Sequence, residues 1–220
     1  LVGTVRDITE PKAAEERDHL LTKELNHRVK NRFAIMSGMI SMTARTSANV
    51  QEMGKALRGR VLALASAHSL IQPAMSAGTA DTKDAPLPAL LSAVLEPHTS
   101  VADTVRFDGP ALTLSAAMAS NMALVFHEFA TNASKYGALS AKEGRLDIRW
   151  DLEDGEDRAM VRLKWIEQGG PAVEGPPDAR GFGTTLIDVT VRSQMSGTLN
   201  SSWDVDGVRH ELVLPARLFV

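Results

Sequence analysis

The sequence contains no cysteine among its 220 residues. This absence excludes disulfides, thiolate zinc sites and a cysteine nucleophile, and it is consistent with a reducing compartment. Aromatic residues make up only 5% of the chain, but hydrophobic residues as a whole make up 44%, which is enough to bury a sizeable core. No hydrophobic run approaches the length of a membrane-spanning helix, and the N-terminus has no basic region followed by an apolar stretch. We therefore expect a cytoplasmic location without membrane insertion.

The chain also lacks a strong excess of either charge. Its 24 Lys and Arg residues stand against 27 Asp and Glu residues, so the formal net charge is -3. General binders of nucleic acid or of anionic membranes are usually basic. The sequence therefore gives no reason to expect a nucleic-acid partner, although a local basic cluster could still meet a phosphate.

The first part of the chain predicts a short terminal segment and two helices. Residues 1–10 alternate in polarity like the end of a strand and predict the tail of an upstream domain. Between residues 11 and 76, apolar residues recur at steps of three and four, first to about Thr46 and again from Val50 to Ile71. Two long helices with a short loop predict an antiparallel hairpin, which usually needs another pair of helices to complete its core. We therefore expect a dimer that forms a four-helix bundle.

Two histidines of this hairpin differ in their predicted surroundings. On a wheel of about 100 degrees per residue, His27 lies nearly opposite the apolar stripe of the first helix and should face solvent. The residues alone leave open a surface residue without a task, a metal ligand or a nucleophile, but no pair of histidines stands at ligand spacing. His68 falls within the stripe of the second helix, so we expect it to be buried and hydrogen-bonded. That stripe consists of Val50, Met53, Leu57, Val61, Leu64, His68 and Ile71.

Residues 77–86 are rich in small residues, proline and glycine, and they predict a linker. Residues 87–220 predict helices and mostly antiparallel strands, with a last hairpin that turns at Asp206 and Gly207. The predicted elements are helices at about 87–95 and 116–136 and strands at about 104–107, 145–152 and 158–167. This order indicates an α/β sandwich. The predicted fold class is therefore α+β, with a helical hairpin followed by an α/β sandwich.

Three polar residues share one face of the helix predicted over residues 116–136. Glu128, Asn132 and Lys135 are spaced by four and three residues, so a carboxylate, an amide and an ammonium group lie side by side. The opposite face is apolar and should anchor the helix to its sheet; it carries Met118, Met122, Phe126, Phe129 and Ala133. Any surface helix shows such a division, so the spacing alone does not establish a site.

Two further motifs lie close to chain breaks. The strand in "LKWIEQGGP" places Trp165 and Glu167 on one face just before a Gly-Gly-Pro break. Further on, "RGFGTT" is a glycine turn that opens a helix, where unpaired backbone N–H groups and the positive end of the helix dipole suit a phosphate. The intervening residues 168–180 hold three Gly and three Pro. We expect this segment to close over a ligand as a mobile lid.

Together these motifs resemble those of the HWE-type sensor histidine kinases. "HEFATNASKYGALS" is similar to the asparagine box of that family, "ELNHRVKNRFAIM" to its phosphoacceptor box and "RGFGTTLI" to its second glycine box. Trp165 and Glu167 correspond to its Trp-x-Glu pair. The four motifs occur in the order of the family over about residues 20–216. "GTVRDITEPKAAEE" also resembles, on fewer residues, the tail of a PAS-type sensor domain. The resemblance implies a phosphoacceptor hairpin and an ATP-binding domain of the GHKL (Bergerat) type.

For the hairpin, the resemblance implies a phosphoryl transfer. His27 would take the γ-phosphoryl group of ATP on a ring nitrogen, and an aspartate of a response-regulator receiver domain would then remove it. A neutral imidazole with an unperturbed pKa of about 6.5 is a competent nucleophile at cellular pH. Many sensor kinases outside this group carry an acidic residue directly after the phosphoacceptor, but Arg28 stands here. The base is therefore unassigned, and Glu24, on roughly the same helical face, is our candidate for polarising the imidazole.

For the second domain, the resemblance implies a site for ATP and Mg²⁺. Asn132 would offer its amide oxygen to Mg²⁺, Lys135 would meet phosphate, and Glu128 would hold a metal-bound water or orient the phosphates. Glu167 stands where the wider ATPase superfamily has an Asp and would accept a hydrogen bond from the adenine amino group, which favours ATP over GTP. The other expected contacts are Tyr136 against the base and the glycine-turn residues Gly169, Gly170, Gly181, Phe182, Gly183 and Thr184.

Two other classes of protein stay open. One is a non-catalytic histidine phosphotransfer or scaffold protein with the same fold, whose expected sign is loss of Asn132 or of the glycine turn; the chain retains both. The other is a related ATPase or serine kinase without a phosphoacceptor helix, against which the box around His27 argues. The partners expected for the kinase are a response regulator, a PAS-like sensor domain in the same polypeptide and a second copy of the chain.

Overall fold

The computed structural model describes residues 37–38, 40–41, 43–45, 47, 49–71, 84–99, 104–153, 159–176 and 181–219. The chain divides into two units, Leu1–Ser47 and Ala48–Val220. In the first unit, the described residues between 37 and 45 are helical. The predicted PAS-like tail, Glu24 and His27 lie outside the described residues. Over the part of the chain that is described, none of the helices combines the length and the apolar character needed to span a bilayer.

The second unit contains a five-stranded sheet with the order β2-β4-β5-β7-β6. Only β2 and β4 run parallel, and every other neighbouring pair is antiparallel. The strands are β2 (Val105–Asp108), β4 (Arg145–Glu153), β5 (Met160–Gln168), β6 (Thr198–Asp204) and β7 (Gly207–Pro215). Burial alternates along β5, where Val161, Leu163 and Trp165 are buried and their neighbours are only partly buried. This period of two gives the sheet one apolar face and one polar face.

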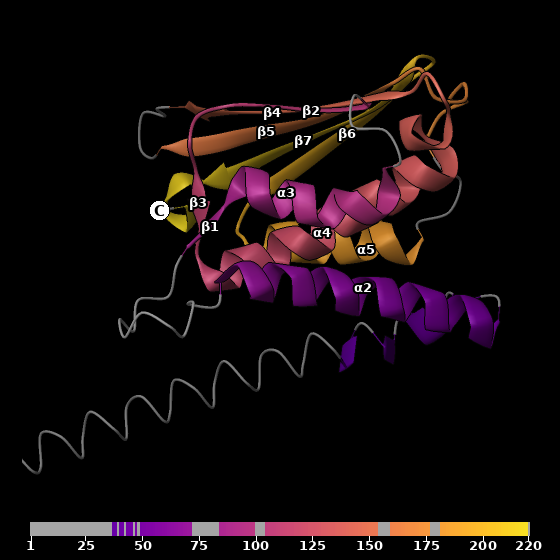
Figure 1. Cartoon of the computed structure of the whole chain (residues 1–220), viewed down its shortest axis with the longest axis horizontal. Coiled ribbons are helices and arrows are strands. Elements are labelled where there is room, and N and C mark those ends of the chain that lie inside the picture. The colour runs from indigo at the N-terminus through magenta and orange to yellow at the C-terminus, as the bar shows by residue number, and fades with distance from the viewer. Residues whose placement is uncertain are drawn as a thin grey trace, which may run out of the picture. The chain divides into compact units, whose positions relative to one another are not determined.

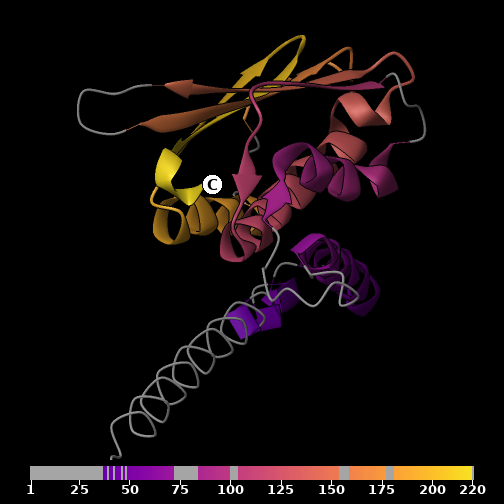
Figure 2. The same ribbon diagram turned by 60° about the vertical axis from the view of Figure 1, so that its left-hand side comes forward.

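Three helices cover the apolar face of the sheet (Figures 1 and 2). They are α3 (Leu87–Leu95), α4 (Ala116–Tyr136) and α5 (Phe182–Val189), the last continuing as a π-helical turn over Thr190–Gln194. Short 3-10 turns span Glu96–His98, Ala138–Ser140 and Ala216–Leu218. The α/β sandwich predicted from the sequence is confirmed, with α4 starting after Ser115 and ending at Gly137 as expected. A second, antiparallel sheet of β1 (Ala85–Pro86) and β3 (Thr113–Leu114) was not predicted, because strands of two residues show no period.

The core lies between α4 and the sheet. The five apolar residues predicted to anchor α4 are all buried: Met118, Met122, Phe126, Phe129 and Ala133. The ring of Trp165 lies 5.4 Å from that of Phe129 and 6.3 Å from that of Phe126, measured between centroids. His210 of β7 stacks on the other side of Phe129 at 4.2 Å, and burial lowers the pKa of this histidine to about 4. A neutral imidazole therefore completes an aromatic cluster that seats α4 on the sheet.

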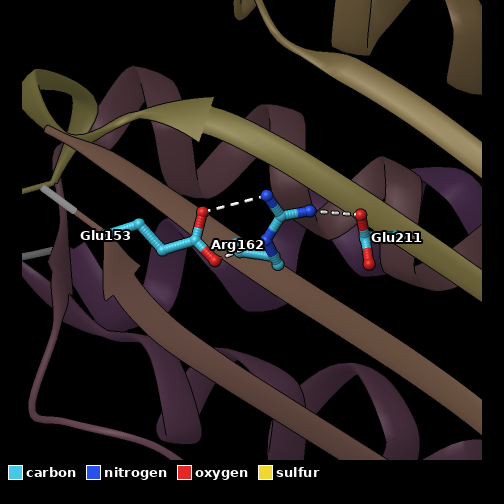
Figure 3. Close-up of polar contacts among 3 residues, drawn as sticks. All are labelled: Glu153, Arg162 and Glu211. Atoms are coloured by element: carbon cyan, nitrogen blue, oxygen red, sulfur yellow. Dashed lines mark hydrogen bonds and ion pairs between the residues drawn. The ribbon is translucent and has the colours of Figure 1, made fainter. Parts of the chain in front are cut away.

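The opposite face of the sheet carries charged residues that tie three strands together. Figure 3 shows Arg162 of β5 between Glu153 of β4 and Glu211 of β7. Its guanidinium donates to both carboxylate oxygens of Glu153, at 2.6 and 2.9 Å, and also to Glu211. The hydrogen bond from Arg162 lowers the pKa of Glu153. Because these groups are solvated, the network serves strand register more than stability.

Helix α2 (Val50–Ile71) packs against α4 and α3 within the same unit. Its buried residues are Arg60, Ala63, Ala67 and Ile71. Of the predicted apolar stripe only Ile71 is buried: Val50 is 86% exposed, Val61 is exposed, and His68, expected to be buried, is also exposed. The physical reason is that small residues let two helix backbones approach closely, which outweighs side-chain hydrophobicity at this contact.

Gly59 marks the tightest point between α2 and α4. A Cβ added at this position would lie 2.8 Å from Nε2 of His127, whereas a Cβ at Gly54 of the same helix would meet nothing within 4 Å. Both glycines lie inside a helix, where alanine is intrinsically favoured. The two positions therefore differ only in the space that α4 leaves.

This contrast yields a matched pair of variants. We expect Gly54→Ala to raise the free energy of unfolding by about 0.5–1 kcal/mol, because it removes only the conformational cost of glycine. Gly59→Ala should gain less or lose stability, because the methyl group displaces the His127 ring. Urea unfolding of both variants at pH 8 measures the difference. Equal gains at the two positions would show that α2 does not pack closely on α4 in solution.

Candidate functional site

The polar face of α4 changes character along its length. Glu128 is 4% exposed, whereas Asn132, Lys135 and Tyr136 are exposed. The three groups that spacing placed on one face therefore differ in access to solvent. The exposed amide and ammonium groups are free to meet a ligand, and the carboxylate at the start of the row is enclosed by its neighbours.

Arg60 of α2 encloses Glu128. Its Nε donates to Oε1 of Glu128 at 2.6 Å and its Nη2 donates to Oε2 at 3.2 Å, with both side chains almost fully buried. A bidentate guanidinium contact of this kind neutralises a carboxylate that burial would otherwise penalise. The pair joins two residues that stand 68 positions apart in the sequence.

The glycine turn at the start of α5 lies against the same carboxylate. A Cβ added at Gly183 would fall 2.5 Å from Oε2 of Glu128. Gly181 caps the helix, Phe182 is its first residue, and Thr184 in the first turn is exposed. The asparagine-box helix and the second glycine turn are therefore in contact, with Glu128 between Arg60 on one side and Gly183 on the other.

Glu167 is the second buried carboxylate of the unit, and backbone and indole donors hold it. Trp165 Nε1 donates to its Oε1 at 2.9 Å, and the backbone N–H of Ala138 donates to its Oε2 at 3.0 Å. Burial raises the pKa of Glu167, while these two hydrogen bonds act in the opposite direction. Each carboxylate oxygen has a second lone pair, so the group can still accept a hydrogen bond from a ligand.

The chain around Glu167 requires glycine. A Cβ at Gly137 would lie 2.0 Å from Oε2 of Glu167, and one at Gly170 would lie 2.8 Å from the backbone nitrogen of Ala138. Gly169 has a φ of +69°, in the left-handed region that favours glycine. The end of α4 and the end of β5 thus meet backbone to backbone at the Glu167 carboxylate.

These contacts define two ends of one candidate site along α4. Glu128 meets the glycine turn of α5 at one end, and Gly137 meets Glu167 at the other, about 14 Å away at the rise of an α-helix. Asn132 and Lys135 lie between them. Oxygen donors and an ammonium group in this order suit a magnesium ion and phosphates at one end and a hydrogen-bonding base at the other.

The donors alone do not form a metal site. Within the described residues, no group of three or more His, Asp or Glu side chains is arranged to hold a metal ion. Mg²⁺ commonly takes one or two protein oxygens and completes its shell with waters and substrate phosphates. The residues present fit a metal that arrives with a nucleotide, with Asn132 as the protein donor and Glu128 as a partner for a metal-bound water.

A polar hollow of about 370 Å³ opens beside Glu167. Its lining consists of Glu167, Gln168, Asp204, Asp206, Gly207 and Arg209. Glu128, Asn132 and Lys135 do not belong to that lining. The lining also lacks Trp165 and Ala138, which hold the Glu167 carboxylate, so the hollow lies beside the turn between β6 and β7. Glu167 and Glu128 are both 4% exposed, and α2 covers the carboxylate at the phosphate end.

His127, the histidine of the asparagine box, lies at the α2 contact. Its ring is 5.4 Å from that of His98, whose Nδ1 lies 3.1 Å from Oγ of Ser134. Burial, with the nearby His98 and Arg60, lowers the pKa of His127 to about 4. The residue is neutral at cellular pH and packs against Gly59.

Sequence reasoning missed two residues of the site. The spacing of two residues along a strand placed Trp165 and Glu167 on one face, but it did not predict that the Trp165 N–H donates to Glu167. Arg60 carried no sequence signal, because its partner is distant in the chain and arginine is usually exposed. Glu24 and His27 lie outside the described part of the chain, so their roles remain predictions.

The fold of the chain is found in solved histidine kinases. The histidine kinase domain of a blue-light activated histidine kinase from Erythrobacter litoralis superposes with a TM-score of 0.57 at 19% identity, covering 83% of this chain and 95% of that one. A longer structure of the same kinase gives a TM-score of 0.64 at 19% identity, covering 98% of this chain and 62% of that one. The chain therefore shares its fold with these histidine kinase structures.

Sequence comparison supports the family that the motifs indicate. Residues 24–111 match the model of the HWE histidine kinase family. Blue-light-activated histidine kinase 1 of Erythrobacter litoralis is 35% identical over 96% of this chain and 57% of its own length. A blue-light-activated histidine kinase of Brucella anthropi is 31% identical over 98% of this chain and 43% of its own. The chain spans about half the length of these relatives. The resemblance read from the motifs is confirmed: the HWE histidine kinase model matches residues 24–111, and nearly the whole chain is similar to these two histidine kinases.

The contact between Trp165 and Glu167 predicts a pH-dependent loss of stability. Trp165→Phe keeps the aromatic packing but removes a hydrogen bond to a buried carboxylate, which costs about 1.5–3 kcal/mol. A carboxyl group whose folded pKa is raised lowers stability above that pKa and does so less as the pH falls through it. The variant should therefore be weakened most at pH 8 and least at pH 4 to 5.

Urea unfolding across this pH range measures the effect, and Trp203→Phe on β6 is the matched control. We expect the control to show no comparable change with pH. A deficit of Trp165→Phe that stays constant from pH 8 to pH 4 would mean that the indole only packs.

Proposed function

We propose that this chain is the kinase portion of a two-component sensor histidine kinase. It binds Mg-ATP on the polar face of α4, transfers the γ-phosphoryl group to a ring nitrogen of His27 and passes it to an aspartate of a response-regulator receiver domain. The match to the HWE histidine kinase family model and the similarity to named histidine kinases support the reaction class. A PAS-like sensor domain upstream in the same polypeptide supplies the signal, and the protein acts in the cytoplasm.

One observation carries the proposal for the nucleotide site. The carboxylate of Glu128 lies against Gly183, so that two motifs read separately from the sequence, the asparagine box and the second glycine turn, share a contact. Backbone N–H groups at a helix N-terminus attract phosphate, and phosphoryl transfer depends mainly on positioning and charge neutralisation. In this proposal Asn132 holds Mg²⁺, Lys135 meets phosphate, and Glu128 orients the phosphates or a metal-bound water.

At the other end of the site, Glu167 recognises the base. Donors on Trp165 and Ala138 fix the orientation of its carboxylate, which leaves an acceptor for the amino group of adenine. Guanine presents a carbonyl oxygen at that edge, which a carboxylate repels. Tyr136 packs on the base, and the turns at Gly169–Gly170 and Gly181–Thr184 bend around the nucleotide. We therefore expect ATP to bind more tightly than GTP.

The rival reading is a phosphotransfer or scaffold protein that has lost nucleotide binding. Both Asn132 and the glycine turn before α5 are present. Glycine also stands at the two positions that lie closest to the carboxylates, Gly183 beside Glu128 and Gly137 beside Glu167. These features favour the kinase. Binding of Mg-ATP to the purified chain separates the two readings directly.

His27 and Asn132 allow separate tests of transfer and binding. With labelled Mg-ATP we expect the chain to acquire an acid-labile, base-stable phosphate. His27→Ala should abolish the label without changing ATP affinity, because it removes the acceptor but not the nucleotide site. Asn132→Ala should weaken Mg-dependent binding by about tenfold or more, the equivalent of at least 1.4 kcal/mol. Labelling and calorimetry measure the two effects.

Two controls keep the outcome specific. His68→Ala changes an exposed histidine of α2, and Asn121→Ala changes another asparagine of α4; both should label and bind normally. Undiminished labelling of His27→Ala would remove that residue from its role, and normal Mg-ATP affinity in Asn132→Ala would exclude the amide as a metal ligand.

The exposed apolar residues of α2 support a homodimer formed through the helical hairpin. Val50, Val61 and Leu62 are all exposed on a helix whose other side packs on α4. If two chains share a four-helix bundle and transfer occurs between them, a mixture of the His27→Ala and Asn132→Ala chains should regain label, which neither shows alone. No labelling in the mixture, with a dimer seen by light scattering, would instead place transfer within one chain.

A further inference from the structure

Helix α2 belongs to the predicted phosphoacceptor hairpin and also contacts the candidate nucleotide site. By sequence it is the second helix of the phosphoacceptor hairpin, yet it packs against α4, the helix of the asparagine box. The contact places Gly59 against His127 and Arg60 against Glu128, so consecutive residues of one helix meet consecutive residues of the other. The interface is therefore specific at the level of single side chains.

In this interface the charges of Arg60 and Glu128 are paired with each other. The two bonds between Arg60 and Glu128, at 2.6 and 3.2 Å, use the fork geometry in which a guanidinium binds a carboxylate most tightly. Both groups are buried, so the attraction between the two charges must compensate for the hydration that each has lost. Removing α2 from α4 would return Glu128 to solvent and make its oxygens accessible to a cation.

The proposed function requires that same carboxylate for Mg-ATP. A guanidinium and a metal-bound water cannot occupy the same carboxylate oxygens at once, and Glu128 is enclosed by Arg60 and the Gly183 turn. Resting on the proposed function, we propose that Arg60 is a positioning residue that acts through Glu128. It docks the second helix of the phosphoacceptor hairpin on the nucleotide-binding domain and competes with Mg-ATP for the carboxylate, so that nucleotide binding and release of α2 are coupled.

The two faces of α2 fit this role. The buried residues of α2 are Arg60, two alanines (Ala63 and Ala67) and, in the last turn, Ile71, which is the one larger apolar side chain among them. Small residues give a close contact with little apolar area to lose on separation. The hydrogen-bonded ion pair is therefore the feature whose exchange decides whether α2 stays docked.

Calorimetry on the chain tests the competition. When a binding-competent state is populated only in part, the apparent Kd rises by the inverse of that fraction. For a competent fraction of about a tenth, Arg60→Ala should lower the Kd for Mg-ATP about tenfold. The gain should vanish for ATP in EDTA, because it depends on the carboxylate meeting a metal-bound water. Arg58→Ala, an exposed arginine of the same helix, is the matched control and should leave the Kd unchanged.

If Arg60→Ala folds poorly, Arg60→Lys is the variant to measure instead, because lysine keeps the positive charge but cannot form the two parallel hydrogen bonds of a guanidinium. It should lower the Kd for Mg-ATP by less than Arg60→Ala. An unchanged or weaker Mg-ATP affinity in the Arg60 variants overturns the proposal, as does an equal gain with and without the metal. If the parent chain itself binds no Mg-ATP, the proposed function fails and this inference with it.

A distance measurement tests release without relying on affinity. The chain has no cysteine, so nitroxide labels at Arg58→Cys on α2 and Asp151→Cys on β4 report one distance. We expect Mg-ATP to lengthen or broaden this distance in the parent, and Arg60→Ala to show the altered distribution before nucleotide is added. A distribution that Mg-ATP leaves unchanged, in a chain that binds it, overturns the coupling.

Discussion

The packing of α4 on the sheet is the interaction on which the rest of the structure depends. The apolar side of α4 is held by an aromatic cluster in which Phe129 contacts both Trp165 and a neutral His210. Because one side of the helix is fixed in this way, the direction of every polar side chain on the other side is also fixed. The helix thus sets where Glu128 meets the α5 turn and where Gly137 meets Glu167.

The two buried carboxylates on this framework are solvated in different ways. Glu167 is held by an indole N–H and a backbone N–H, which orient the group without supplying a full charge. Glu128 is held by a guanidinium from another helix, which supplies a full opposite charge. A neutral donor leaves a carboxylate able to attract one more donor, while a bound cation must first be displaced by another cation. Both carboxylates are 4% exposed, but only Glu128 must lose a bound cation before it can meet another one.

Much of this arrangement follows from local sequence pattern. The extent of α4 could be predicted because apolar residues recur with the helical period between a serine and a glycine, and β4 and β5 could be predicted from strict alternation. Which face of α2 meets the domain could not. Hydrophobicity selected Val50 and Val61, but a helix contact depends on how closely two backbones approach, and that is decided by small residues and by the surface of the partner.

The same limit applies to the site. The spacing of Glu128, Asn132 and Lys135 indicated a shared face, yet it carried no information about a partner from α2, because periodicity describes one element at a time. The Trp165 and Glu167 pair was visible on one strand face, but the hydrogen bond depends on how deeply both side chains are buried. Contacts between elements, rather than the elements themselves, are what sequence reasoning lacked.

Arg60 lies on the helix that precedes the α/β sandwich in the chain, so a movement of α2 acts directly on the Glu128 carboxylate. Any rotation or shift of α2 that moves Arg60 by a few ångströms breaks a bidentate contact whose strength depends on geometry. Linkage then works in both directions, since whatever favours undocking favours Mg-ATP to the same extent. A buried ion pair that adds little net stability can thus be retained because it makes two states of the helix discrete.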